Sequence, residues 1–218
     1  MHKTFSALAA ALLIGATSQC LAETAKTPAP LHMKMAAQSS EHCLPGETKA
    51  SAPAEMTPIP NADADKQFAS LVTEVITVTG VVKHPLVLRV DDLKKFPAKS
   101  VKGLQMTCLD GANKGKMPLV RGALLRDILT KAELDAPGHN DVKRMIIVAT
   151  ASDGYKVVYS WAEVFNSSQA DGMIVYYEKN GQPIGNDEGR IAMLSSKDIK
   201  TGPRHVKWLK SIEVKRID

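Results

Sequence analysis

The sequence predicts an α+β domain with a mixed or antiparallel β core and short helices. Short β-rich runs outnumber helical stretches along the chain, and the helical stretches are brief. The 218 residues are 44% hydrophobic and 23% charged, an ordinary globular profile with room for one main domain. Aromatic residues make up only 5%, so we expect the core to consist mainly of Val, Ile, Leu and Met.

The net charge of +5 does not by itself indicate a nucleic-acid partner. Proteins that bind nucleic acid usually carry clusters of basic residues, often interleaved with aromatic ones. The sequence contains no such block, so we expect no nucleic-acid partner.

Residues 1–22 have the pattern of a cleavable signal peptide. Lys3 supplies a positive charge, Phe5 to Thr17 form an apolar run too short to span a bilayer, and Ala22 is the small residue before the expected cleavage site. We therefore expect export to the periplasm, with no transmembrane segment in the mature chain.

Residues 23–70 are predicted to be a disordered linker rich in Pro and Ala. The stretch from Glu23 to Lys66 holds six of the twelve prolines and no aromatic residue, so it lacks the apolar surface needed for a core. It also contains potential soft metal ligands: His32, Met33, Met35, His42 and Cys43. These types suit copper, but their irregular spacing favours a flexible spacer.

The folded domain is predicted to span 71–218. Its first half is expected to contain strands at Glu74–Val82, Leu86–Val90 and Lys99–Leu109, a short helix at Val90–Phe96 that Asp91 caps, and a polar loop at Asp110–Pro118. Its second half is expected to contain a helix at Ala123–Ala132, a hairpin formed by Val142–Ala151 and Tyr155–Tyr159, a helix opened by a capping box at Ser160–Glu163, and strands at Met173–Glu178, Ile191–Leu194 and Val206–Val214. Asn180-Gly181 is a type I′ turn signal.

Two places could carry chemistry. Cys108 follows a predicted strand, where a thiolate could bind a soft metal, although free cysteines are more often small buried hydrophobes. Residues 200–210 combine a glycine with Arg204 and Lys207, which could bind a phosphate. The alternative for this second segment is an edge strand kept soluble by its charges. No nucleotide-binding, zinc or haem-attachment motif is present in the sequence.

Several segments resemble, in order, the sulfite-oxidase-like, molybdopterin-binding oxidoreductases. The similarity runs over about residues 74–217. The segments that carry it are Thr77–Val82 with Asp92-Leu93, Thr107-Cys108, Arg121–Leu129, Ser152–Tyr155, Asn180–Ile184 and Gly202–Val214. The resemblance implies the molybdopterin-binding fold and a cofactor in which a pterin dithiolene holds molybdenum.

The resemblance also implies roles for particular residues. Cys108 would be the catalytic cysteine and the ligand of the metal. Arg204, His205 and Lys207 would hold the phosphate and polar edge of the pterin, Arg190 would add an anion contact, and Asp153 would line the same region. The protein would then be a periplasmic molybdenum-dependent oxidoreductase that uses an external electron carrier.

Two other readings are open. The resemblance to short exported members of the family implies one alternative, in which the chain binds a metal-free pterin and is a periplasmic sensor that signals to a membrane partner. In a third reading the domain has no ligand, and Cys108 is simply buried or oxidised with Cys43.

Overall fold

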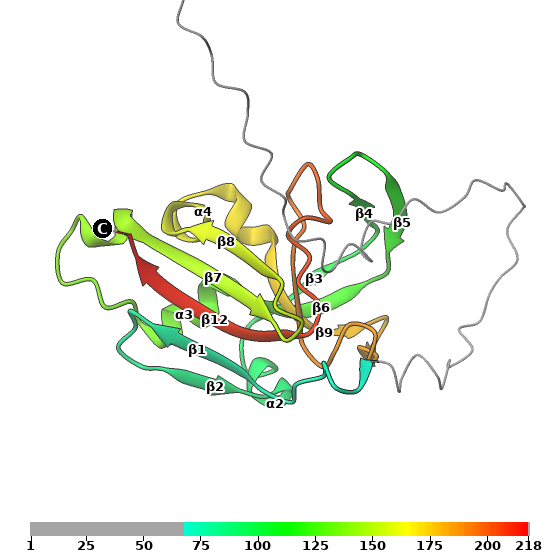
Figure 1. Ribbon diagram of the computed structural model, residues 1–218, viewed down its shortest axis with the longest axis horizontal. Helices are drawn as coiled ribbons and strands as arrows, with labels where there is room; N and C mark the ends of the chain where they lie inside the picture. Colours follow the sequence, from blue (N-terminus) through cyan, green and yellow to red (C-terminus); the bar gives the residue numbers. More distant parts are fainter. Residues whose placement is uncertain (1–67, 218) are drawn as a thin grey trace, which may run out of the picture. The chain divides into compact units, whose positions relative to one another are not determined.

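The computed structural model describes residues 68–217. The predicted signal peptide (1–22) and nearly all of the predicted linker, with Cys20 and Cys43, lie outside the described residues. Two five-stranded sheets and a separate hairpin make up the described part, and short helices connect some of their strands (Figure 1). This confirms the predicted α+β class. None of the helices within residues 68–217 is long and apolar enough to cross a membrane.

The first sheet has the order β2-β1-β12-β7-β8. Its strands are β1 (Ile76–Gly80), β2 (Leu86–Leu88), β7 (Met145–Ala151), β8 (Lys156–Ser160) and β12 (Leu209–Arg216). The β1–β12 pair is parallel and the other pairs are antiparallel, so this sheet is mixed, one of the two arrangements that the sequence predicted. β7 and β8 form the hairpin that Asp153-Gly154 predicted, with Gly154 at a φ of +91°.

The second sheet is antiparallel, with the order β10-β9-β6-β3 and β11 also paired to β9. Its strands are β3 (Ala98–Val101), β6 (Val120–Leu124), β9 (Met173–Lys179), β10 (Gln182–Pro183) and β11 (Ala192–Ser195). Asn180 and Gly181, between β9 and β10, both have positive φ, as the predicted type I′ turn requires.

Strand β9 is buried on both faces, which explains its unbroken apolar sequence. Because side chains alternate along a strand, Val175 and Tyr177 face one hydrophobic cluster while Ile174 and Tyr176 face another. The first cluster is the main core and includes residues of β1, β7, β12 and the helix α3 (Leu125–Ala132). The second cluster continues to Met117 and Ile184.

The helices follow the predicted pattern over shorter spans. α3 buries Leu125, Ile128, Leu129 and Ala132 at helical spacing, but it begins two residues later than predicted because 123–124 belong to β6. The predicted capping box is confirmed at α4 (Trp161–Phe165), where Ser160 accepts a hydrogen bond from the Glu163 amide. α2 (Val90–Leu93) begins one residue before the predicted cap Asp91 and ends earlier than predicted. Two short 3-10 turns, η2 (Asp141–Arg144) and η3 (Ser168–Gly172), precede β7 and β9.

The segment around Cys108 differs from the prediction. The single strand expected at Lys99–Leu109 is divided at Gly103 (φ +66°) into β3 and β4 (Leu104–Thr107). The expected loop at Asp110–Pro118 contains a strand, β5 (Asn113–Met117), that pairs with β4. The exposed, lysine-rich sequence of β5 lacks the apolar alternation by which strands are recognised.

Candidate functional site

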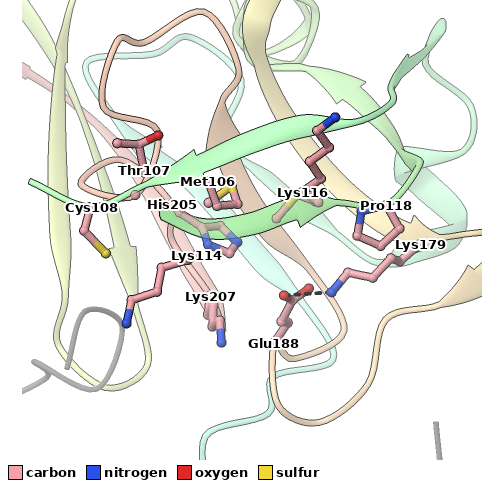
Figure 2. A pocket seen from close by; sticks show the side chains of 12 residues that line it. Met106, Thr107, Cys108, Lys114, Lys116, Pro118, Lys179, Glu188, His205 and Lys207 are labelled. Carbon is pink, nitrogen blue, oxygen red and sulfur yellow. Dashed lines mark ion pairs between the residues drawn. The ribbon is translucent and has the colours of Figure 1, made fainter. Parts of the chain in front are cut away.

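A cavity of about 310 Å³ lies where the β4–β5 hairpin meets the segment before β12 (Figure 2). This volume is at the lower end of the range for pockets that hold small molecules. Its lining combines sulfur, cationic and buried polar groups with a few apolar ones: Met106, Thr107, Cys108, Lys114, Lys116, Met117, Pro118, Lys179, Glu188, Gly202, His205 and Lys207.

Three hydrogen bonds tie the end of β4 to the segment that carries Gly202. The buried Thr201 hydroxyl accepts from the Thr107 amide at 2.9 Å and donates to the Gln105 carbonyl at 2.7 Å. The Gly202 amide donates to the Thr107 carbonyl at 2.9 Å. A Cβ on Gly202 would lie 3.0 Å from that same carbonyl oxygen, so glycine permits the close approach. These contacts bring Cys108 to the segment that contains His205 and Lys207, although almost a hundred residues separate them in sequence.

Cys108 is 1% exposed and begins a tight turn. Its amide donates to the Ala112 carbonyl, and its carbonyl accepts from the Gly111 amide. The cysteine is disulfide-bonded, and it is the only cysteine within residues 68–217. A sulfur in a disulfide cannot act as a thiolate, so metal binding by Cys108 requires that this bond first be reduced.

Lysine side chains give the cavity its positive charge. Lys114 and Lys116 come from β5, Lys179 from the end of β9, and Lys207 from the turn before β12. Lys179 forms an ion pair with Glu188 at 2.9 Å. Within residues 68–217, neither Lys116 nor Lys207 forms an ion pair, and the Lys207 ammonium lies 5.8 Å from the centre of the Trp208 ring. In Figure 2 the side chains of Lys114 and Lys207 extend in the same direction as the Cys108 sulfur.

On the side of the cavity away from Cys108, buried polar groups form a hydrogen-bonded network (Figure 2). The Tyr176 hydroxyl donates to Glu188 Oε2 at 3.0 Å and lies 2.8 Å from His205 Nε2. Glu188 and His205 are each 5% exposed and Tyr176 is fully buried. Burial, together with the nearby charge of Glu188, raises the pKa of Tyr176 well above its ordinary value.

A strained turn places Lys207 beside this hydrogen-bonded network. Trp208 adopts a φ of +49°, which is unusual for a bulky residue. Its amide donates to the Glu188 carbonyl and its indole N–H donates to the Asn186 carbonyl, each at 2.7 Å. Gly189 leaves room for this contact, since a Cβ there would lie 3.0 Å from Trp208 Cα. The two segments therefore hold each other in place.

Of the residues predicted for the site, Cys108, His205 and Lys207 line the cavity together. Arg204 does not, because its guanidinium is turned away to a different set of partners. It donates to Asp198 at 2.7 Å and to Glu163 at 2.8 Å, and it lies 4.7 Å from the centre of the Tyr159 ring. The hydrogen bonds that its guanidinium donates to Asp198 raise the pKa of Arg204 above its ordinary value.

Arg190 and Asp153 also lie away from the cavity lining. Arg190 is exposed and pairs with Glu74 at 3.5 Å. Asp153 is exposed in the β7–β8 turn, where it accepts a hydrogen bond from the Tyr155 amide. Tyr155 donates to the Pro203 carbonyl at 2.6 Å, so this turn supports the segment that precedes His205.

Sequence reasoning missed the lysines of β5, Lys179 and the pair Tyr176–Glu188. Lys114 and Lys116 are two residues apart and so share one face of β5, a signal that becomes visible only once the segment is recognised as a strand. Tyr176 lies within an apolar run and gives no polar signal in the sequence.

The residues of this cavity fit an anionic, sulfur-bearing metal cofactor in charge and donor type. Lys114, Lys116 and Lys207, together with His205, match phosphate and other anionic groups, while Lys179 is paired with Glu188. Cys108 supplies one soft donor at the cavity wall, available once it is reduced. Within residues 68–217 no group of three or more His, Cys, Asp and Glu side chains is placed to hold a metal. A metal at this site would therefore take most of its ligands from the cofactor rather than from these residues.

Comparison with known proteins shows to which family the domain belongs. The model of the family described as oxidoreductase molybdopterin binding domain matches residues 66–218. No curated protein matches the chain. Among solved structures, the chain is similar to the sulfane dehydrogenase SoxCD from Paracoccus pantotrophus, at 15% identity and a TM-score of 0.47. That alignment covers 66% of this chain and 39% of the other, so the chain spans well under half of that structure. Because the family match takes in the whole described domain and the cavity with it, the chain belongs to the oxidoreductase molybdopterin binding domain family.

Proposed function

We propose that this protein is an exported molybdenum-dependent oxidoreductase that passes electrons to a separate carrier. One observation carries the proposal: Cys108 lines the same cavity as His205 and Lys207, although almost a hundred residues separate it from them in sequence. Family membership supplies the cofactor class. When bound, such a cofactor supplies a metal that exchanges electrons or an oxygen atom with a substrate, while the protein orients it and tunes its electronics.

In this proposal the residues that line the cavity have different roles. Cys108, once reduced, provides a thiolate ligand to the metal. Lys207 holds an anionic group of the cofactor as a point charge, and Lys114 and Lys116 add to the same positive field. His205 offers a ring nitrogen to a polar edge of the ligand. No haem-attachment or dinucleotide-binding motif occurs in the sequence, and this supports the external carrier.

Metal and pterin analysis of protein isolated from its native host is the decisive test. We expect about one molybdenum atom and one pterin per chain in protein whose Cys108 is reduced. Pterin without metal in protein with reduced Cys108 would contradict the enzyme proposal and would favour the sensor. Protein with neither would favour the domain without a ligand.

Two substitutions test the roles of the residues. Cys108→Ser removes the sulfur donor, so we expect loss of bound molybdenum and of redox turnover while the circular dichroism spectrum keeps its native form. Lys207→Ala removes a cavity cation and should weaken cofactor retention. Lys210→Ala is its matched control, because Lys210 is an exposed lysine of β12 that does not line the cavity. Equal cofactor content in both lysine variants would contradict the role of Lys207.

Export is tested separately. The sequence of residues 1–22 supports cleavage after Ala22. We expect the protein in the periplasmic fraction, with Glu23 as its first residue in N-terminal sequencing. Recovery of the uncleaved chain from the cytoplasm would contradict this part of the proposal and would leave the cofactor proposal standing.

A further inference from the structure

Glu188, Tyr176 and His205 form a hydrogen-bonded network in which the Tyr176 hydroxyl makes two contacts but has only one proton to donate. Glu188 Oε1 accepts from the Lys179 ammonium at 2.9 Å, and Oε2 accepts from the Tyr176 hydroxyl at 3.0 Å. The same hydroxyl lies 2.8 Å from His205 Nε2. A phenol has one proton to donate, and an ionised carboxylate has none.

The position of each proton follows from this count. The ion pair with Lys179 compensates the buried carboxylate of Glu188, which can then only accept hydrogen bonds. The phenol must donate its proton to Glu188. Its oxygen can take part in the second contact only as an acceptor, so His205 Nε2 must carry a hydrogen. The raised pKa of Tyr176 keeps the phenol protonated throughout the physiological range.

We propose that Tyr176 and Glu188 are positioning residues that keep a proton on Nε2 of His205 and so make Nδ1 the ring nitrogen that can accept a hydrogen bond or a proton. Figure 2 shows the His205 ring between Cys108 and the Lys179–Glu188 pair. A molecule that reaches Nδ1 with an N–H or O–H group would meet an acceptor in the ring rather than a second donor. Only the identity of that molecule rests on the proposed function.

The tautomer can be read directly by nitrogen and carbon NMR of the full chain with labelled histidine. The chain has six histidines, and His205→Gln identifies the signals of His205 by their loss. At about pH 9, where an ordinary imidazole is neutral, we expect the Nε2–H form to dominate. Tyr176→Phe removes the acceptor and should shift the tautomer ratio by about tenfold toward Nδ1–H, the scale of one buried hydrogen bond.

Two further variants sharpen the test. Tyr159→Phe is the matched control: Tyr159 is also a buried tyrosine, but its hydroxyl contacts Ser195 rather than His205, so the ratio should not change. Glu188→Gln introduces an N–H group that can donate to the phenol oxygen. It should shift the ratio in the same direction as Tyr176→Phe, because the phenol proton is then released toward His205.

Several results would overturn the inference: a wild-type ring with its proton on Nδ1, a ring still protonated on both nitrogens at about pH 9, or an unchanged ratio in both Tyr176→Phe and Glu188→Gln. If a variant fails to fold, the wild-type spectrum decides alone. The measurement needs no molybdenum. Protein from the native host that had reduced Cys108, held no molybdenum and showed the Nε2–H form would therefore contradict the proposed function and leave this inference intact.

Discussion

The buried hydroxyl of Thr201 connects the two halves of the cavity wall, so its removal should cost stability out of proportion to its size. Thr201→Val keeps the shape of the side chain and deletes its hydrogen-bonding atom. Two main-chain groups then lose their partner: the amide of Thr107 and the carbonyl of Gln105. Both hydrogen bonds are partly buried, so water replaces them only in part.

The magnitude follows from those two groups. A buried polar group left without its partner costs about 1–3 kcal/mol, so two partly buried groups should together cost about 2–4 kcal/mol. Thr201→Ser keeps the hydroxyl and loses one methyl group, which should cost only about 0.8 kcal/mol. The difference between the two variants isolates the hydrogen bonds from the loss of packing.

Urea denaturation followed by circular dichroism, with the disulfide intact in every sample, gives the free energies of unfolding. Thr79→Val is the surface control. Thr79 is an exposed strand residue whose hydroxyl has no hydrogen bond within the described part of the chain, so its change should stay within about 0.5 kcal/mol. The reasoning is refuted if Thr201→Val unfolds like the wild type, or if Thr201→Ser loses as much stability as Thr201→Val.

Three other predictions concern acid, thiol chemistry and the second sheet. Burial would raise the pKa of Glu163, but hydrogen bonds from Ser160 and Arg204 outweigh it and lower the pKa. The ionised Glu163 carboxylate therefore contributes its full stabilisation above its ordinary pKa of about 4.5, and this stabilisation is lost as the pH falls through its lowered pKa. Glu163→Gln should make the free energy of unfolding, measured by denaturation at several pH values, decrease less steeply with falling pH. Cys108 should resist alkylation in unfolded protein until a reductant is added, and labelling without reductant would contradict its disulfide. Gly122→Ala would place a Cβ 2.1 Å from the Val175 carbonyl oxygen, so β6 and β9 should separate and the melting temperature should fall by several degrees, and an unchanged melting curve would contradict this contact.

Much of the fold could be predicted because the spacing of apolar residues along the sequence indicates which side chains are buried. Strand β7, the helix α3 and the capping box at Ser160 follow from an apolar run, a helical spacing and a capping pattern that each depend on a few neighbouring residues. Strand β5 could not be predicted in this way. Its first four residues are exposed, and pairing with β4 rather than burial makes it a strand.

The site was predictable only in part, and for a related physical reason. Sequence order places Arg204, His205 and Lys207 together, but backbone geometry sends them to different surroundings. His205 and Lys207 face the cavity, while Arg204 turns to Asp198 and Glu163. A sequence shows that a cation is present, but it does not show which carboxylates the fold will bring to that cation.

The pairing of β1 with β12 has a consequence for how the molecule is assembled. Strand β12 occupies the middle position of the first sheet and contacts β1 on one side and β7 on the other. Until residues 209–216 have been synthesised, β1 and β7 have no common neighbour and that sheet is split in two. Folding of this sheet must therefore await the synthesis of β12, and deletion of residues 209–216 would leave the pairs β2-β1 and β7-β8 without the strand that joins them.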